Sequence, residues 1–390
     1  MPRLAEGAAS LRGLAVYLFP FPAFATLPRL PWHSPTVIST MAAVFGDMSD
    51  HISYKYNFRA SGSQPSTPST ASSPIDSTYS SGQSTMSAST PSVAVDDEGD
   101  TSSSVSGAAS IFEELSSLIS EDDKYTFSTA VKLANYIKKR VEACLASSTG
   151  CYLLVTGVPD NKEAQIDSLL ARRQIRNQVR IMHEPTIKSL IIKLMPGVPH
   201  ELTTYALEAR ITSKVVALPG HTIFSLLGIK AARFYGSGGG SKEGDSGFRP
   251  ATRASDDFPS FMIEVGYSET MEKLRKDAKW WLTASTHGPV TKMVIIIKIN
   301  RDPPALELEV WVMGPNTATM LMRSRPPTVP ACVQSFDIDA AGTVTPTPAA
   351  NGLRIPYLTL FDVPHPHAAD IIISLDELSE LALVIFQNGL

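Results

Sequence analysis

Apolar residues form regular patterns only in the part of the chain that follows residue 110. Continuous or alternating apolar runs predict strands there, and apolar residues three or four positions apart predict helices. The expected strands cover 151–159, 232–235, 261–265, 294–299 and 306–313, with two more within 180–196 around a turn at His183–Thr186. The expected helices cover about 120–145, 164–173, 201–218 and 268–285. This mixture predicts one α/β (α+β) domain over residues 111–390.

Two of the expected helices have an identifiable buried face. The first is expected to begin near Ser120 or Asp123, and its apolar positions are Phe127, Val131, Ala134, Ile137, Val141 and Leu145. In the helix expected at 268–285, with Ser268 as N-cap, they are Met271, Leu274, Ala278, Trp281 and Leu282. The strand at 306–313 alternates, so Glu307 and Glu309 are expected on an exposed face. After Arg323 the chain is rich in proline and ends in the strand-like 353–361 and the helix-like 373–386.

Residues 1–110 lack this patterning. Between Ser61 and Ser110 the sequence is mainly Ser, Thr and Pro. Its few large apolar side chains cannot offset the entropy cost of ordering, so a disordered tail is expected. The stretch Gly13–Leu27 is loosely similar to the apolar part of a secretory signal, but Pro20 and Pro22 interrupt it. Because Met41 and Met48 offer later starts, the expectation leaves open whether residues 1–40 belong to the mature protein.

Charge and cysteine content limit the class of protein. Residues 111–390 carry 29 Lys and Arg against 30 Asp and Glu, whereas nucleic-acid binding usually produces a net positive charge. Any basic groove must therefore be local. The three cysteines are too scattered in sequence for a disulfide framework or a zinc site, which favours an intracellular location, nuclear or cytoplasmic, over secretion. No apolar run is long enough to cross a bilayer, so no membrane partner is expected.

Three acidic residues at the edges of regular elements are candidates for chemistry. Glu201 opens a predicted helix, Asp245 follows a glycine-rich turn, and Glu264 lies inside an otherwise apolar strand. A carboxylate in such a strand is costly to desolvate unless a cation, a donor or a metal meets it. Two carboxylates brought together repel each other, and a hard divalent cation relieves this repulsion.

These residues belong to motifs in a particular order: a hairpin ending in Met-Pro, a helix beginning His-Glu, a strand, and then KEGD, EVGYSE and DAKWWL. Over roughly 183–313 this order resembles the bacterial putative restriction endonuclease family of the PD-(D/E)xK nuclease superfamily. It also resembles a group of uncharacterised fungal proteins with EVGYSE-like motifs. The resemblance implies a nuclease-like core with a mixed central sheet flanked by helices. It further implies that Asp245 and Glu264 bind Mg²⁺ or Mn²⁺, and that Glu201 is an auxiliary acid.

The motifs depart from the superfamily pattern at two positions. Gly244 stands where proline precedes the Asp, and Gly266 stands where a lysine follows the Glu by two residues. A lysine that has migrated to another element is therefore expected. On the helix at 268–285, Lys279 and Arg275 share one flank of the apolar face, from which a long side chain can reach over a sheet edge. Lys279 is the first choice for the catalytic cation, and Arg275 is the second.

Two functional hypotheses follow. The first is a magnesium-dependent nuclease, with DNA as the candidate substrate, whose catalytic residues are Asp245, Glu264, Lys279 and Glu201. The second is a catalytically inactive relative that keeps the fold as a nucleic-acid-binding or protein-interaction module. Each residue also has a structural explanation: Asp245 can cap a turn, Glu264 can pair with a buried cation, and Glu201 is an ordinary first-turn helix acid. The basic residues Arg172, Arg173, Arg176 and Arg180 are expected on a solvated helix face.

The division of the chain into an unpatterned tail and a patterned domain predicts the outcome of limited proteolysis. Dilute protease should rapidly remove residues 49–110 and leave a resistant core that begins near Ile111, because an unpacked segment is cleaved first. N-terminal sequencing of the resistant fragment tests this expectation. A stable fragment that retains Ser61–Ser110 would contradict it.

Overall fold

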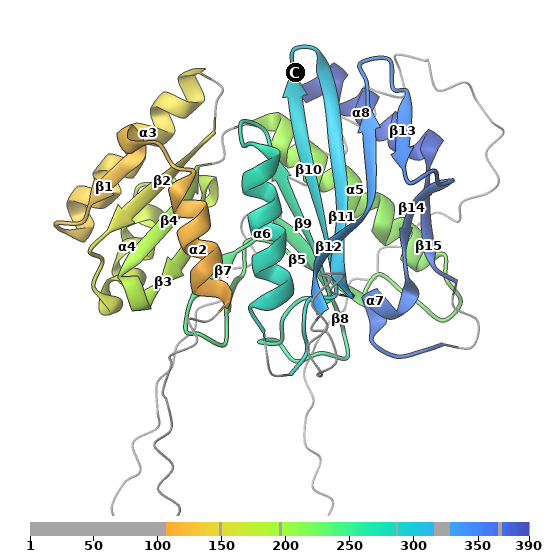
Figure 1. Cartoon of the computed structure of the whole chain (residues 1–390), viewed down its shortest axis with the longest axis horizontal. Helices are drawn as coiled ribbons and strands as arrows, with labels where there is room; N and C mark the ends of the chain where they lie inside the picture. The colour runs from red at the N-terminus through yellow and green to blue at the C-terminus, as the bar shows by residue number, and fades with distance from the viewer. Residues whose placement is uncertain are drawn as a thin grey trace, which may run out of the picture. The chain divides into compact units, whose positions relative to one another are not determined.

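The described part of the chain contains two large β-sheets, one of six strands and one of seven (Figure 1). The computed structural model describes residues 107–147, 150–194, 197–285, 288–315, 328–365 and 369–389. All of them fall within one compact unit, Asp96–Leu390. The tail predicted for residues 1–110 lies outside the described residues up to position 106, so that prediction stays untested. The first described element is helix α2, Gly107–Ser117.

The six-stranded sheet has the order β1-β2-β4-β3-β7-β6. Its centre is the antiparallel set β2, β4 and β3, whose strands are rich in aliphatic residues. Helices α3 and α4 contribute to the same apolar core as one face of this sheet. The elements are β1 (Lys124–Thr126), β2 (Cys151–Thr156), β3 (Val179–Glu184), β4 (Ser189–Leu194), β6 (Arg233–Tyr235), β7 (Ser241–Glu243), α3 (Ala130–Ser147) and α4 (Glu163–Arg172).

The two faces of the six-stranded sheet are chemically different. Because side chains alternate along a strand, Ile181 and Ile192 pack with α3 and α4. Their neighbours Arg180 and Lys193 lie on the opposite face and are opposite each other in register. All residues of β3 and β4 are buried, including these two cations. A buried face with charges requires partners, and these come from the second sheet.

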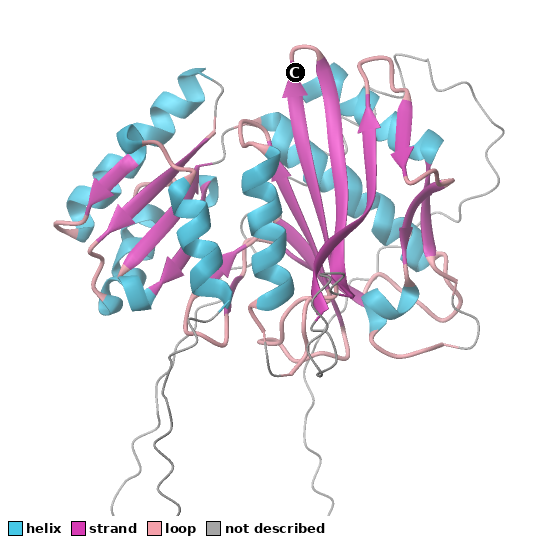
Figure 2. Ribbon diagram, viewed as in Figure 1, coloured by secondary structure: helices cyan, strands magenta, loops and turns pink. Residues whose placement is uncertain are grey.

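The seven-stranded sheet has the order β13-β12-β11-β10-β9-β8-β5. Strands β8 and β9 form an antiparallel pair, and β10 runs parallel to β9 after the crossover helix α6. The long strands β10 and β11 dominate this sheet in the ribbon view (Figure 2). The elements are β5 (Leu226–Ile229), β8 (Ser246–Pro250), β9 (Phe261–Gly266), β10 (Met293–Arg301), β11 (Pro304–Pro315), β12 (Thr328–Ile338), β13 (Val344–Thr347) and α6 (Met271–Thr283).

Helices cover both faces of the seven-stranded sheet. Helix α5 (Val198–Val216) and helix α8 (Leu375–Gly389) share one core with alternate residues of β9, β10 and β11. A two-stranded sheet of β14 (Gly352–Ile355) and β15 (Ile371–Ser374), with the short α7 (Tyr357–Phe361), completes this core. On the other face α6 packs on β9 and β10, and α2 packs on α6 (Figure 1). Helix α6 is therefore buried on two sides.

The positions of most predicted elements are confirmed, including β2, α4, the β3–β4 hairpin, α5, β6, β9, α6, β10 and β11. The first helix is a correction, because α3 begins at Ala130 rather than near Ser120 or Asp123. The segment before it forms α2, a 3-10 turn at Glu121–Asp123 and β1. Thr129 caps α3 by accepting a hydrogen bond from the Lys132 amide at 3.2 Å.

Three further expectations about faces and caps are wrong. The cap of α6 is Thr270, which accepts from the Lys273 amide, whereas Ser268 accepts from the Gly150 amide. Glu309 is buried, because Arg275 and the Trp311 indole donate to it; only Glu307 stays partly exposed. In α3 the predicted Ala134, Ile137 and Val141 are buried, but Val131 and Leu145 are exposed, and Ala130, Leu133 and Cys144 are buried in their place.

No helix among the described residues combines the length and apolar character needed to span a membrane.

The shifted face of α3 predicts a difference in stability between two neighbouring positions. Leu133 is fully buried and Val131 is 48% exposed. Leu133→Ala should therefore lower the free energy of unfolding by about 2–5 kcal/mol through lost packing, and Val131→Ala should change it by about 0.5 kcal/mol or less. Urea unfolding of both variants measures this. Equal losses, or a larger loss at Val131, would contradict the placement of the helix.

Candidate functional site

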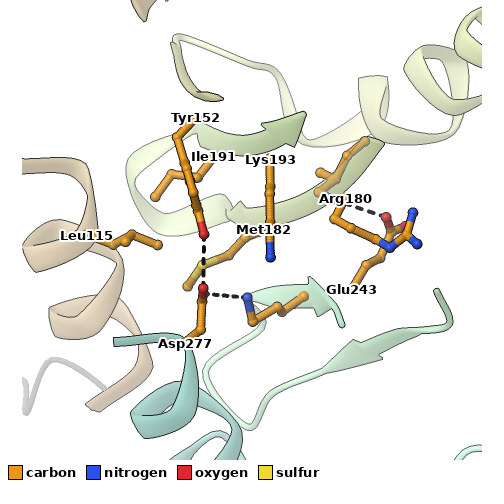
Figure 3. Close-up of a pocket in the computed structure, with 10 residues that line it drawn as sticks. Leu115, Tyr152, Arg180, Met182, Ile191, Lys193, Glu243 and Asp277 are labelled. Carbon is orange, nitrogen blue, oxygen red and sulfur yellow. Dashed lines mark hydrogen bonds and ion pairs between the residues drawn. The ribbon is translucent and has the colours of Figure 1, made fainter. Parts of the chain in front are cut away.

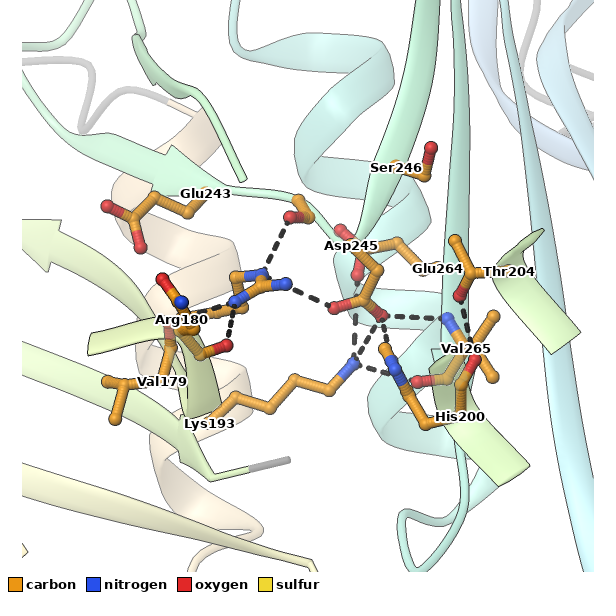
Figure 4. Close-up of polar contacts among 12 residues, drawn as sticks. Val179, Arg180, Lys193, His200, Thr204, Glu243, Asp245, Ser246, Glu264 and Val265 are labelled. Atoms are coloured by element: carbon orange, nitrogen blue, oxygen red, sulfur yellow. Dashed lines mark hydrogen bonds and ion pairs between the residues drawn. The ribbon is translucent and has the colours of Figure 1, made fainter. Parts of the chain in front are cut away.

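Asp245 lies where the chain passes from one sheet to the other. Strand β7 of the six-stranded sheet ends at Glu243, and β8 of the seven-stranded sheet begins at Ser246, so only Gly244 and Asp245 connect them. The carboxylate of Asp245 is fully buried between the sheets. Its Oδ2 accepts a hydrogen bond from the Val265 amide at 2.9 Å, which fixes it against β9 (Figure 4). A buried carboxylate in this position needs cations.

Lys193 of β4 supplies the nearest cation. Its Nζ donates to Asp245 Oδ2 at 2.8 Å and to the Val265 carbonyl at 2.9 Å. The same Nζ lies 3.8 Å from Glu264 Oε2 (Figure 4) and 3.7 Å from Glu269 Oε1. Burial alone would lower the pKa of Lys193, but the charge of Asp245 and the neighbouring carboxylates raises it. Lys193 is therefore a fixed cation among three carboxylates.

Glu264 extends from β9 toward α6. Its Oε1 accepts a hydrogen bond from the Trp281 indole at 2.6 Å and lies 3.6 Å from Lys242 Nζ. Burial raises the pKa of Glu264 to about 8, against the opposing charge of Lys242 and with the help of Asp245. Asp245 behaves in the opposite way: burial would raise its pKa, but Lys193 and His200 hold it well below its usual value. Near neutral pH the pair therefore consists of an ionised Asp245 and a protonated Glu264.

His200 connects Asp245 to the predicted auxiliary acid Glu201. Both residues lie in the first turn of α5. His200 Nε2 is 3.1 Å from Asp245 Oδ2, which is close enough for an ion pair although the geometry is not that of a hydrogen bond. Burial lowers the pKa of His200, but Asp245 outweighs this effect and raises it to about 9. Glu201 Oε1 lies 3.5 Å from His200 Nδ1, and its side chain is 70% exposed. Glu201 thus adjoins the pair through His200.

A second ion pair borders this group. Lys242 Nζ donates to Asp277 Oδ1 at 2.6 Å, and the Tyr152 hydroxyl donates to Asp277 Oδ2 at 3.1 Å (Figure 3). Together with Lys193 and Arg180 these side chains line a cavity of about 10 Å³, which is room for one water molecule. Leu115 of α2 also lines it (Figure 3). We call Arg180, Lys193, His200, Lys242, Asp245, Glu264, Glu269 and Asp277 the buried charge cluster.

The two motif departures have a steric cause. A Cβ on Gly244 would lie 2.2 Å from the Met262 methyl group and 2.9 Å from the Trp281 ring. A Cβ on Gly266 would lie 2.9 Å from both Glu269 Oε2 and Leu274 Cδ1. Such distances are far below van der Waals contact, so a side chain at either position would have to displace these neighbours. The position where a lysine was expected is filled by Glu269 and Leu274, and Lys193 reaches the carboxylates from another strand.

Asp245 and Glu264 lie 2.8 Å and 3.8 Å from Lys193 Nζ, but the two predicted cations lie elsewhere. Lys276 pairs with Glu114 of α2 and is the main cause of the lowered pKa of that carboxyl, to which the charge of Lys279 adds. Arg275 forms an ion pair with Glu309 of β11. Arg275 and Lys279 therefore face Glu309 and the surroundings of Glu114, and the lysine beside the two acids is Lys193 of β4.

Most residues of the buried charge cluster are not among the candidate site residues named from the sequence. Lys193 lies in the apolar run SLIIKL, so the desolvation argument that singled out Glu264 applies equally to it. Lys242, Glu269 and Asp277 lie inside the quoted motifs KEGD, EVGYSE and DAKWWL but were not assigned roles. Arg180 is a correction: it is a buried strand residue, and its Nε donates to the Gly244 carbonyl at 3.1 Å.

Asp245 and Glu264 offer oxygen atoms of the kind that a divalent cation needs as ligands. Asp245 Oδ1 is buried and accepts no hydrogen bond from any described group, and Arg180 Nε lies 4.0 Å from it. Asp245 and Glu264 offer the hard oxygen atoms that Mg²⁺ and Mn²⁺ prefer. Among the described residues no group of three or more His, Cys, Asp and Glu side chains has the arrangement of a metal site. The pair therefore supplies two oxygen ligands rather than a closed cage.

No protein-family model matches this chain, and the comparison with curated proteins finds no match. A function for the chain therefore has to be inferred from the geometry of the site.

The cluster predicts which lysine matters for stability. Lys193→Met should lower the free energy of unfolding by about 3–5 kcal/mol, because it leaves buried carboxylates without their cation. Lys279→Met, the matched control on α6, should change it by about 0.5 kcal/mol. Adding Asp245→Asn to Lys193→Met should cost less than the sum of the two single changes, because the two residues interact directly. Additive losses in urea unfolding would contradict the pairing.

Proposed function

We propose that the protein is a metal-dependent nuclease-like enzyme that hydrolyses phosphodiester bonds, with DNA as the candidate substrate. In this proposal Asp245 and Glu264 hold Mg²⁺ or Mn²⁺, and Lys193 takes the role of the catalytic lysine. The observation that carries it is the position of Lys193 Nζ, 2.8 Å from Asp245 Oδ2 and 3.8 Å from Glu264 Oε2. Two carboxylates and one lysine are then together although the sequence has glycine at the expected lysine position.

The order of elements gives further support. The resemblance led us to expect a helix, a strand, an Asp-bearing turn, a Glu-bearing strand, a second helix and an aliphatic strand. The corresponding elements are α5, β6, the Gly244–Asp245 link with β8, β9, α6 and β10. Strands β8, β9 and β10 are neighbours in one sheet, whereas β6 belongs to the other. Asp245 and Glu264 therefore come from adjacent parts of one framework, which is what a shared cation requires.

The proposed chemistry divides the work between the carboxylates and the lysine. A bound divalent cation supplies polarisation of the phosphodiester and a more acidic attacking water. Asp245 and Glu264 would bind and orient that cation through hard oxygen atoms. The Lys193 ammonium, held by the Val265 carbonyl, would stabilise the negative charge that develops on the phosphoryl oxygens. His200, with its pKa raised to about 9, would keep Asp245 ionised and hold a proton beside it.

A second candidate function follows from the burial of the same residues. The Asp245 carboxylate is fully buried and already balanced by Lys193 and His200, and the adjoining cavity has room for one water molecule. An arrangement closed in this way is typical of a structural polar core. It supports the inactive relative, a nuclease-fold protein acting as a nucleic-acid-binding or protein-interaction module.

A cleavage assay with matched variants separates the two functions. Wild-type protein should cleave single- or double-stranded DNA only with Mg²⁺ or Mn²⁺, and Glu264→Gln should abolish cleavage. Lys193→Met should lower the rate on the order of a hundredfold or more, because a positioned charge-stabilising group typically contributes that much. Lys279→Ala and Arg275→Ala should retain wild-type rates, and all variants are compared at equal folded fraction, measured by circular dichroism.

The outcomes point in different directions. If Lys279→Ala is the damaging change and Lys193→Met retains its rate, the role assigned to Lys193 is wrong. If the wild-type protein shows no metal-stimulated cleavage of DNA or RNA, the second candidate function replaces the first.

A further inference from the structure

Two of the three cysteines, distant from any motif, lie side by side. Cys144 is in the last turn of α3, and Cys151 is the first residue of β2. Their Sγ atoms are 3.5 Å apart. A disulfide bond has an S–S distance of about 2.05 Å, so a shift of roughly 1.5 Å would join them. The third thiol, Cys332, is exposed and belongs to β12 of the other sheet.

A guanidinium group stands beside one of the two sulfurs. Arg140 lies one helical turn before Cys144 on α3, and its Nη2 donates to Cys151 Sγ at 3.6 Å. The same group forms an ion pair with Asp123, which holds it in place. A cation next to a thiol favours the thiolate, and the thiolate is the reactive form. Cys144 is buried and Cys151 is half-buried, so the residue beside the guanidinium is also the more exposed of the two.

The thiol of Cys151, which is beside Arg140, is more acidic than the thiol of Cys144. The hydrogen bond from Cys144, together with the Arg140 guanidinium, lowers the pKa of Cys151 to about 7 although burial opposes this. The same hydrogen bond and burial raise the pKa of Cys144. Both shifts favour the thiolate on Cys151 and the thiol on Cys144.

We propose that Cys144 and Cys151 are a modification site for hydrogen peroxide: Cys151 attacks the peroxide and Cys144 converts the product to an intramolecular disulfide. In the first step the Cys151 thiolate bonds to one peroxide oxygen and the O–O bond breaks. The departing hydroxide takes up a proton to become water, and Cys151 is left as a sulfenic acid. In the second step Cys144 loses its proton and bonds to the Cys151 sulfur. The S–O bond breaks, and a second water leaves. One hydrogen peroxide thus oxidises two thiols.

This site is independent of the proposed nuclease function, although it adjoins the buried charge cluster. Cys151 is opposite Leu194 in the sheet, and Tyr152 is opposite Lys193. The amide of Gly150 donates to Ser268 Oγ at 2.8 Å, next to Glu269. A disulfide at this point would tie the end of α3 to the strand that flanks Lys193.

The experiment uses the full chain and hydrogen peroxide as the probe. Reduced protein is treated with a small excess of peroxide at pH 7 and analysed by mass spectrometry without reduction. The expected product is one chain lighter by two hydrogens, with Cys144 linked to Cys151 and Cys332 still reactive toward maleimide. Cys144→Ser should instead accumulate a sulfenic acid on Cys151 that dimedone traps, and Cys151→Ser should leave Cys144 unreacted.

A second variant tests the guanidinium. Arg140→Gln should raise the pH midpoint of Cys151 alkylation and slow its oxidation at pH 7 on the order of tenfold, since a thiol of ordinary pKa is mostly protonated there. Cys332, which lies on β12 of the other sheet, should keep its rate in both proteins. The proposal is overturned if Cys332 is oxidised first, if the disulfide links two chains, or if Cys144 reacts at the wild-type rate in Cys151→Ser.

Discussion

The structure depends on the neutralisation of charges that two sheets bury against each other. The six-stranded sheet turns Arg180 and Lys193 toward Asp245 in the link between the sheets and toward Glu264 of the seven-stranded sheet. Neither set is stable when buried alone, because an unpaired charge in a protein interior costs several kcal/mol. The two sheets therefore require each other, and the link Gly244–Asp245 is where the chain crosses between them.

The same constraint explains the details around the link. Gly244 lacks a side chain because Met262 and Trp281 fill the space in front of it. Trp281 in turn donates to Glu264, so the aromatic packing of α6 and the polar contacts of β9 are parts of one arrangement. Helix α2 closes the outer side of α6 and contributes Leu115 to the small cavity. A change at any of these positions alters how well the charges are paired.

The burial of this cluster also displaces the pKa values of its members. The fold lowers the pKa of Asp245 and raises the pKa values of Glu264 and His200, and Lys193 lies between the two acids. Displaced pKa values of this kind are common at functional sites. The proposed nuclease chemistry uses the ligating oxygens and the lysine, and the inactive alternative uses only the pairing. The dithiol at Cys144 and Cys151 is a separate consequence of the same sheet, because β2 begins beside the end of α3.

The sequence by itself determined the local elements and part of the site. Apolar periodicity located β2, α4, α5, β9, α6 and β10, since these segments bury a continuous face and the pattern records it. An acid in an apolar strand identified Glu264, and the order of motifs placed Asp245 beside it. Only the tertiary structure decided which cation meets them: Lys193 is 52 residues from Asp245 in the chain, and sequence patterns carry no information about which face of a distant sheet opposes a strand. For the same reason the sequence did not predict that α2 packs on α6 or that the sulfur atoms of Cys144 and Cys151 lie close together. It also did not predict that α3 begins at Ala130.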